Sequence, residues 1–288
     1  MIHELFKSYW LKRYLLHIKK KGFLSFIRNG LSFFMGMLSP KRVGSFPFSY
    51  YFKKKRRLNK KFCDKNLLNF DDVNIERYFN YYLNSKKITK SPIIYSFGIG
   101  GQIKFEEILA EKFDAKIFCY DPTSKDFIKN YKNNSKIKLY PYGIWNKDEK
   151  IKFYYLDGQK EKGASITNYF ETKEEDFGEE LQCYTLKTLM NNNNHYYIDI
   201  LKMDIEGAAI KVFDNILNDK IYPNQIVTEF EFSEKDDLTK EDEIRYKEFE
   251  KKLIELINKM KFLNYKCYNM PKFTNQPFHS IEVLFVKN

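Results

Sequence analysis

The sequence predicts a doubly wound α/β fold with a mostly parallel sheet. Its 288 residues are 43% hydrophobic and 18% aromatic, which supplies a sizeable core and excludes a wholly disordered chain. From about residue 91, short apolar runs alternate with amphipathic stretches, as in proteins whose helices cover both faces of a parallel sheet. Little helical sequence separates the last two runs, so they predict a terminal antiparallel hairpin.

The predicted strands end in residues that differ from ordinary turns. The first, residues 93–97, ends in Gly98-Ile99-Gly100-Gly101, and the second, residues 116–120, ends in Asp121-Pro122. A later strand, residues 198–203, is apolar except for Lys202 and ends in Asp204-Ile205-Glu206-Gly207. Further strands are predicted over residues 137–140, 151–156, 225–232, 266–269 and 281–286, and helices over residues 105–113, 185–190, 208–217 and 243–260.

The basic character of the chain belongs to its first quarter. Residues 1–65 contain seventeen Lys and Arg against two acids, a net charge of +15, so the rest carries −3 of the total +12. An evenly basic nucleic-acid-binding protein would not divide in this way. We therefore expect two parts: a basic, mainly helical N-terminal extension over residues 1–90, and a domain over residues 91–288.

The N-terminal extension mixes apolar and basic residues. Its longest nearly uncharged stretch, residues 29–40, is too short to span a bilayer, and no small-residue cleavage site follows an apolar run. Two interpretations remain open. The extension packs on the body with its basic face in water, or residues 1–65 rest on an anionic membrane surface or an acidic partner.

Four cysteines, far apart in the sequence and without a C-x-x-C pair, exclude a disulfide scaffold and disfavour a clustered zinc site. They are expected to be reduced, buried thiols of a cytoplasmic protein. If the extension rests on a membrane, we expect the protein to bind peripherally at the inner face of that membrane. The sequence is compatible with a monomer or a homo-oligomer. These cysteines are Cys63, Cys119, Cys183 and Cys267.

The glycines after the first strand and the acid after the second indicate a cofactor that contains adenosine. Gly98, Gly100 and Gly101 let the backbone turn tightly and approach a ligand, and Asp121 stands where a carboxylate accepts hydrogen bonds from ribose hydroxyls. A dinucleotide fingerprint has a third glycine, which favours pyrophosphate binding, but Ile103 stands at that position here. No Walker A lysine follows the glycines either. S-adenosylmethionine has a ribose and no phosphate, so it is the favoured cofactor.

Six segments in order along the chain resemble the motifs of FkbM-type S-adenosylmethionine-dependent methyltransferases. The match runs from about residue 93 to residue 232, and its most specific part is the L-K-x-D-x-E-G element at residues 201–207. The segments are Tyr95-Ser96-Phe97-Gly98-Ile99-Gly100-Gly101, Phe118-Cys119-Tyr120-Asp121-Pro122-Thr123, Gly143-Ile144-Trp145, Thr185-Leu186, Ile198-Asp199-Ile200-Leu201-Lys202-Met203-Asp204-Ile205-Glu206-Gly207-Ala208 and Gln225-Ile226-Val227-Thr228-Glu229-Phe230.

The resemblance implies a class I methyltransferase sheet and O-methylation, often of a sugar or polyketide hydroxyl. It places Ser96, Gly98 and Gly100 at the methionine end of the cofactor, Asp121 at the ribose, and Gly143-Ile144 at the adenine edge. The predicted cofactor site also includes Phe97, Gly101, Pro122 and Asp204. One position departs from the pattern: Glu231 follows Phe230, where relatives often carry His.

Methyl transfer to a hydroxyl needs alignment of the reacting atoms and a group that takes the proton. Strand alternation puts Lys202, Asp204 and Glu206 on one side, and we expect Asp204 to act as base or to organise the acceptor and the cofactor amine. The competing interpretation has Asp204 or Glu206 capping the next helix. Lys202 is expected to neutralise these acids.

Glu229 and Glu231 lie on alternate residues of the next strand and are expected to face the same cleft, so Glu229 joins Asp204 and Glu206 as a candidate catalytic residue. Together with Asp204 they are also candidate ligands of a divalent ion, which is not the favoured arrangement. Four further residues are weighed: His195 as a surface residue, and Ser165, Trp145 and His279 at the border of an acceptor pocket, with Trp145 equally well placed in the core.

The function that this reading favours is O-methylation of a sugar, either nucleotide-linked or part of a surface glycan of the capsule type. One alternative is a degenerate methyltransferase fold that serves as a membrane- or partner-binding module. Another alternative is a nucleic-acid methyltransferase. The mildly acidic body disfavours it because it would repel phosphates. Base-amine methylases also commonly carry Asn/Asp-Pro-Pro-aromatic at the fourth strand end, where this chain has Asp204-Ile205-Glu206-Gly207.

Overall fold

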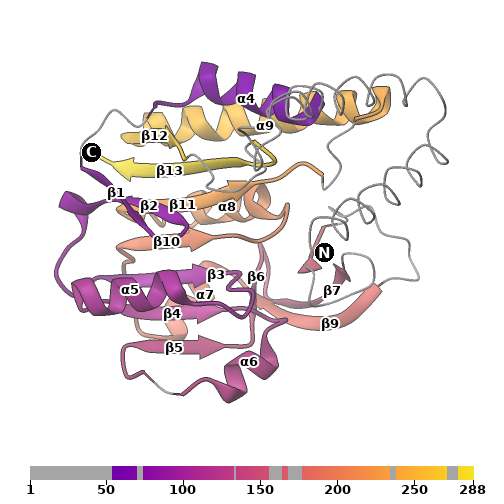
Figure 1. The fold of residues 1–288 in the computed structure, drawn as a ribbon. Helices are drawn as coiled ribbons and strands as arrows, with labels where there is room; N and C mark the ends of the chain where they lie inside the picture. The colour runs from indigo at the N-terminus through magenta and orange to yellow at the C-terminus, as the bar shows by residue number, and fades with distance from the viewer. Residues whose placement is uncertain are drawn as a thin grey trace, which may run out of the picture. The chain divides into compact units, whose positions relative to one another are not determined.

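The structure is a computed structural model that describes residues 54–69, 74–132, 134–155, 164–167, 177–233, 238–270 and 278–288 (Figure 1). The chain divides into two compact units, Met1–Lys53 and Lys54–Asn288. The predictions for the first 53 residues, including the N-terminal helix and its membrane contact, lie outside the described residues. In the described part of the chain no helix is long and apolar enough to cross a membrane.

A seven-stranded sheet forms the centre of the second unit. Figure 1 shows β10, β3, β4 and β5 side by side, with their arrowheads at the same edge. Strands β11, β10, β3, β4 and β5 are parallel, and β13 runs antiparallel between β11 and β12. The order is β12 (Tyr265–Asn269), β13 (Ile281–Lys287), β11 (Gln225–Phe230), β10 (Ile200–Met203), β3 (Ile93–Phe97), β4 (Lys116–Tyr120) and β5 (Ile137–Tyr140).

The chain reverses its direction of travel across the sheet between β3 and β10. It starts at β3, adds β4 and β5 on one side, and then crosses over to add β10 and β11 on the other. Ligands of open α/β sheets bind beyond the carboxyl ends of the strands at such a switch point. The predicted doubly wound sheet and its terminal antiparallel hairpin, formed by β12 and β13, are both confirmed.

Alternating side chains divide the core into two layers, one on each face of the sheet. On β3, Tyr95 and Phe97 belong to the first layer and Ile94 to the second, as the two-residue period of a strand requires. The helices that contribute to the first layer are α4 (Lys54–Asn66), α7 (Leu186–Asn192), α8 (Ala209–Asn218) and α9 (Lys240–Phe262).

A helix and a small hairpin pack against the second face of the sheet. Phe105 and Leu109 of α5 (Lys104–Phe113) pack there. Tyr82 and Leu83, from the hairpin of β1 (Ile75–Tyr78) and β2 (Tyr81–Asn84), pack beside them. A 3-10 turn, η1 (Ser85–Lys87), leads from the hairpin toward β3. The same face carries the polar side chains of Ser96 and Lys202.

Local sequence explains where several helices begin. Thr239 caps α9 through a capping box with Asp242, and the Thr185 hydroxyl accepts from the Thr188 N–H at the start of α7. Helix α5 ends at Asp114 in the left-handed conformation. Another short helix, α6 (Lys125–Asn130), follows β4 and is not among the predicted elements.

A four-stranded sheet lies outside the main one. Its strands are β6 (Gly143–Ile144), β9 (Phe177–Tyr184), β7 (Glu149–Tyr155) and β8 (Ala164–Ser165), in that order. The strand predicted over residues 151–156 corresponds to β7 as far as Tyr155, and β7 pairs antiparallel with β8 and β9.

Residues 54–90, which the sequence assigns to the N-terminal extension, belong to the same compact unit as the rest of the domain. Phe62 and Cys63 of α4 are buried in the first core layer, and Leu83 of β2 is buried in the second. All four cysteines are buried and unpaired, and burial raises the pKa of the thiols of Cys63, Cys183 and Cys267 to about 12.

Candidate active site

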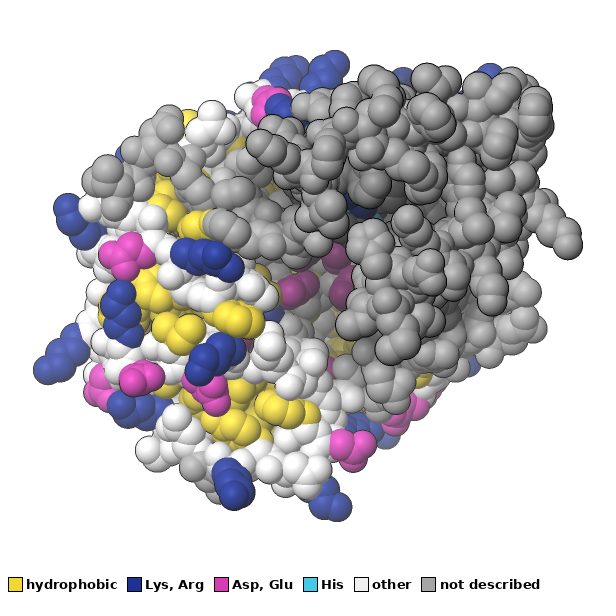
Figure 2. Space-filling model, in the orientation of Figure 1, with side chains coloured by type: hydrophobic (Ala, Val, Ile, Leu, Met, Phe, Trp, Pro, Cys, Tyr) yellow, Lys and Arg dark blue, Asp and Glu magenta, His cyan; other side chains and the backbone are white. Residues whose placement is uncertain are grey.

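A cavity of about 680 Å³ opens at the carboxyl ends of β3, β4 and β10. That volume is within the usual range for sites that take small molecules and cofactors. Figure 2 shows acidic side chains in the hollow near the middle of the face that it presents. The predicted site residues that line the cavity are Phe97, Gly98, Gly100, Gly101, Asp121, Pro122, Gly143, Ile144, Asp204 and Glu206.

The loop after β3 needs glycine for two different reasons. Gly98 has a φ of +72°, and a Cβ there would lie 1.7 Å from the carbonyl oxygen of Asp204. Gly100 also has a positive φ, +55°, but a Cβ there would meet no atom within 4 Å. Because Gly100 lines the cavity, the space beside it is open for a ligand. Gly98 therefore lets two strand ends approach, whereas Gly100 leaves room in the cavity.

Asp121 organises the backbone around the end of β4. Its Oδ2 accepts from the Gly100 N–H at 2.8 Å, and its Oδ1 accepts from the Thr123 N–H at 2.8 Å, the Thr123 hydroxyl at 2.7 Å and the Ser124 N–H at 3.2 Å. The side chain is only 4% exposed but lines the cavity. Oδ2 keeps a second lone pair, so it can still accept from a ligand hydroxyl.

Tyr120 forms the aromatic wall beside Asp121 and is held in place by Asn193. Its ring stacks on Phe97 with centroids 5.0 Å apart and on Tyr140 with centroids 4.9 Å apart. The Asn193 amide donates to the Tyr120 hydroxyl at 2.7 Å, and its oxygen accepts from the Tyr140 hydroxyl at 3.2 Å. Burial raises the pKa of Tyr120, so its hydroxyl stays neutral.

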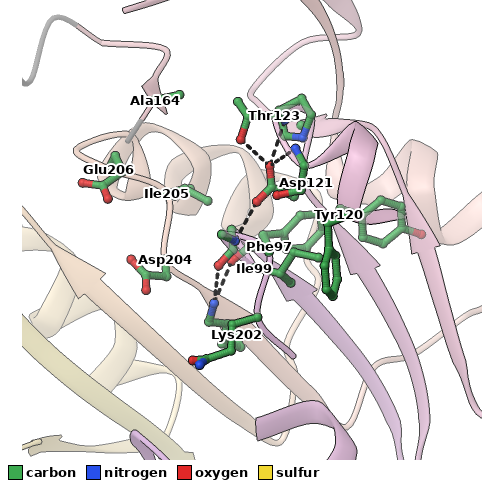
Figure 3. A pocket seen from close by; sticks show the side chains of 18 of the residues that line it. Phe97, Ile99, Tyr120, Asp121, Thr123, Ala164, Lys202, Asp204, Ile205 and Glu206 are labelled. Atoms are coloured by element: carbon green, nitrogen blue, oxygen red, sulfur yellow. Dashed lines mark hydrogen bonds between the residues drawn. The ribbon is translucent and has the colours of Figure 1, made fainter. Parts of the chain in front are cut away.

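Asp204 and Glu206 lie on the opposite side of the cavity from Asp121 (Figure 3). Glu206 has a φ of 44°, a left-handed conformation that is uncommon outside glycine, and Ser165 donates to its carbonyl oxygen. The helix that follows, α8, has Ala208 at its N-cap with no capping hydrogen bond from the side chain. This arrangement gives no support to the interpretation of either acid as a helix cap.

Lys202 differs from the expectation that it neutralises these acids. Its ammonium donates to the carbonyl oxygens of Phe97, at 3.3 Å, and Gly98, at 2.5 Å. The side chain is 3% exposed, so the cation is satisfied mainly by backbone dipoles beside the glycine loop. Lys202 supports the loop rather than forming an ion pair with Asp204.

Tyr81 reaches the same cavity from the β1–β2 hairpin. Its hydroxyl donates to Asp204 Oδ2 at 2.8 Å, and the Lys202 ammonium lies 5.1 Å from the centroid of its ring. No local pattern in the sequence singles out this residue. The aromatic run from Tyr78 to Tyr82, interrupted by Asn80, is a hairpin signal, but it does not indicate which side chain enters a site.

Two predicted site residues do not line the cavity. Ser96 is fully buried on the α5 face of β3, where its hydroxyl donates to Glu106, itself a cavity residue. Glu229 is 6% exposed and lies near Tyr81. Glu231 accepts from the Gly207 N–H at 3.1 Å. Among the described residues, no group of three or more His, Cys, Asp or Glu side chains is placed to hold a metal ion.

The remaining candidates also lie outside the lining of the cavity. The His195 ring nitrogen Nδ1 is 2.9 Å from the Tyr95 hydroxyl, and His279 Nδ1 is 3.5 Å from the Lys55 ammonium. Trp145 is 7% exposed in the first core layer. Ser165 is buried between the cavity residues Ala164 and Ile166.

The residues around the cavity fit S-adenosylmethionine on chemical grounds. Gly100 leaves open space beside the loop, and Asp121 offers a buried carboxylate for hydroxyl groups. Asp204 and Glu206 supply negative charge on the other side, which suits a positively charged sulfur and an ammonium group. No phosphate-binding lysine is needed for such a ligand.

Comparison with known protein families identifies the class. The methyltransferase FkbM domain matches residues 46–267, and the chain therefore belongs to the FkbM family of S-adenosylmethionine-dependent methyltransferases. The crystal structure of precorrin-6y C5,15-methyltransferase from Geobacter metallireducens GS-15 was found as similar, with 8% sequence identity, a TM-score of 0.30, and coverage of 78% of this chain and 96% of that chain. A search of curated proteins found no significant match.

Proposed function

We propose that this methyltransferase transfers a methyl group to a hydroxyl group of a sugar, in a nucleotide-linked sugar or a surface glycan of the capsule type. The observation that carries the proposal is the pair of carboxylates, Asp204 and Glu206, that faces the same cavity as Gly100 and Asp121. A neutral hydroxyl must lose its proton as it is methylated, and a carboxylate within reach of the hydroxyl is a suitable base.

The cofactor supplies a methyl group on a positively charged sulfur, and the chain's own residues do the rest. Asp121 holds the sugar hydroxyls of the cofactor, with Gly143-Ile144 along its base. The glycine loop brings the backbone close, and Phe97 and Tyr120 exclude water from one wall. Asp204 or Glu206 orients the acceptor hydroxyl and takes its proton. Alignment of the reacting groups can contribute about 7–11 kcal/mol, and a general base about 10²–10⁴-fold in rate.

The basic segment supports an acceptor that carries negative charge or is bound at a membrane. Residues 1–65 hold a net charge of +15, whereas the remainder of the chain is mildly acidic. A polybasic segment of this kind is attracted to phosphate groups and to anionic lipid surfaces. We place the enzyme in the cytoplasm on this proposal, in contact with the inner face of a membrane when the acceptor is lipid-bound.

The test is transfer of a labelled methyl group from S-adenosylmethionine to a panel of nucleotide sugars, free sugars and glycan extracts, with and without magnesium. Glu206→Gln and Asp204→Asn are each expected to lower the turnover rate. Replacement of the carboxylate that acts as the general base should lower it by about 10²–10⁴-fold. Asp214→Asn is the matched control, because that α8 carboxylate pairs at the surface with Lys259 at 3.7 Å. Labelling of no sugar, or full activity of both variants, would contradict the proposal.

A further inference from the structure

The β1–β2 hairpin has a fixed register that determines which side chain enters the cavity. Tyr78 pairs with Tyr81 across a two-residue turn, and Ile75 pairs with Asn84 at the other end. A slip of one residue would turn every side chain of β2 to the opposite face. The buried Gln225 side chain accepts from the Asn84 N–H at 2.8 Å and donates to the Asn84 carbonyl at 3.0 Å, which fastens the hairpin to β11.

The tip of the hairpin forms one wall of the cavity. Phe79, Asn80 and Tyr81 all line it. Phe79 has a φ of 53°, a conformation that is an outlier for a bulky residue and persists only where surrounding contacts hold it. The Tyr81 ring packs edge-on against Phe105 of α5, with centroids 4.9 Å apart. The tip is therefore held by packing, and the Tyr81 hydroxyl is directed at Asp204.

The Tyr81 hydroxyl donates to the Asp204 carboxylate and is surrounded by other acidic groups. The charges of Asp204, directly after β10, of Glu229 on β11 and of Glu106 on α5 all act on it. Burial and these three acids raise the pKa of Tyr81, so the phenol keeps its proton. The Lys202 ammonium is the basic group on this face, and it is engaged by the Phe97 and Gly98 carbonyl oxygens.

One oxygen of Asp204 is thereby left for a ligand. Oδ2 accepts from Tyr81, whereas Oδ1 makes no hydrogen bond within the part of the chain that the structure describes. The neighbouring Gly98 carbonyl, an alternative acceptor beside the glycine loop, already receives the Lys202 ammonium. A cationic group of a ligand in this corner of the cavity therefore has Asp204 Oδ1 as its natural partner.

We propose that Tyr81 is a positioning residue that holds Asp204 by one carboxylate oxygen so that the other receives the ammonium group of S-adenosylmethionine. This inference rests on the proposed function, because it takes S-adenosylmethionine as the ligand. It leaves Glu206, on the same side of the cavity, as the carboxylate for the acceptor hydroxyl. The hairpin would then recognise the amino-acid end of the cofactor, and the β4 side its ribose.

The test compares two ligands that differ in the amino-acid end. S-adenosylhomocysteine carries the ammonium group, and 5′-methylthioadenosine lacks the whole amino-acid portion. Titration calorimetry with each ligand is run on the full chain, on Tyr81→Phe, on Asp204→Asn and on the double variant. Tyr81→Phe keeps the ring contacts with Phe105 and Lys202 and removes only the hydroxyl. Tyr78→Phe is the matched control, because it removes a hydroxyl of the same hairpin that donates to Glu76 instead, at 2.9 Å.

Tyr81→Phe and Asp204→Asn are each expected to weaken S-adenosylhomocysteine on the order of tenfold, which corresponds to a hydrogen bond that involves a charged group. Neither should change the affinity for 5′-methylthioadenosine by more than about twofold. The double variant should be no weaker than Asp204→Asn, because both changes act on one contact. Tyr78→Phe should bind both ligands like the wild type.

Equal weakening of both ligands by Tyr81→Phe would show a merely structural effect and would overturn the inference, as would unchanged binding of S-adenosylhomocysteine. Both results would leave the proposed function standing. Failure of the wild-type chain to bind S-adenosylhomocysteine at all would instead contradict the proposed function itself.

Discussion

The two sides of the cavity are built in different ways. On the β4 side, the Asp121 carboxylate accepts four hydrogen bonds, three from backbone N–H groups, including that of Gly100 in the glycine loop, and one from the Thr123 hydroxyl. On the hairpin side, one hydroxyl from a distant strand pair, Tyr81, reaches Asp204 across 123 residues of sequence. Changes on the β4 side should therefore alter both stability and binding, whereas a change to the hairpin hydroxyl should alter binding alone.

Gly98→Ala is expected to have the largest effect. A Cβ at this position would lie 1.7 Å from the Asp204 carbonyl oxygen, and the backbone there is already left-handed with a φ of +72°. Because two central strands would have to separate, the loss in unfolding free energy should exceed about 4 kcal/mol. Urea denaturation measures it, and a loss below about 1 kcal/mol would show that β3 and β10 are not packed as described.

Gly100→Ala is the matched substitution on the same loop. Its φ of +55° imposes a similar backbone strain, but a Cβ would meet no atom within 4 Å. We expect a stability loss of only about 1 kcal/mol together with a loss of cofactor affinity of at least about tenfold, because the methyl group enters the ligand space. Calorimetry and urea denaturation separate the two effects. Wild-type affinity in this variant would place the cofactor elsewhere.

A smaller effect on stability is expected from protonation of His195, which packs behind β3 and β4, away from the hairpin. Its ring lies edge-on to Phe118 with centroids 4.7 Å apart. Burial, and then Lys138 and Lys116, lower the pKa of His195 below its ordinary value of 6.5. As the pH falls through about 6.5, His195 becomes protonated in the unfolded chain before it does so in the folded chain. Protonation therefore favours the unfolded state, and stability is lost.

His195→Gln should remove this part of the acid sensitivity. Urea denaturation of both proteins at pH 7 and pH 5 measures it, and the wild type is expected to lose more unfolding free energy between the two values. Cofactor binding at pH 7 should be unchanged, because His195 does not line the cavity. Equal pH dependence in the two proteins would assign the acid sensitivity to other groups.

Local sequence pattern pointed to several residues that line the cavity, but it did not point to Tyr81 of the hairpin. Gly98, Asp121 and Asp204 each follow an apolar strand directly, so local pattern places them at one edge of the sheet. Ser96 lies two positions before Gly98, inside β3, and its side chain points toward α5 and Glu106 instead of lining the cavity. Tyr81 has no such pattern, because its position depends on the register of β1 and β2 and on Gln225.

Elements outside the main sheet were also harder to predict. The strand β9, Phe177–Tyr184, contains Gly178 and two glutamates, residue types that are depleted in β-strands. It forms because β7 and β6 pair with it. The charge step near residue 65 suggested an extension that reached residue 90, yet α4 and the hairpin bury Phe62 and Leu83 in the core of the second unit. Charge distribution describes the surface and is a weak guide to domain boundaries.

The most direct test of the central claim is titration calorimetry of S-adenosylmethionine with the wild-type chain, with Asp121→Ala and with Asp219→Ala, and with NAD as a control ligand. Asp219 is a surface control that pairs with Lys187 at 3.5 Å. We predict micromolar binding of S-adenosylmethionine by the wild type and by Asp219→Ala, its loss in Asp121→Ala, and no binding of NAD. Absence of S-adenosylmethionine binding by the folded wild-type chain, or binding of NAD in its place, would contradict this account.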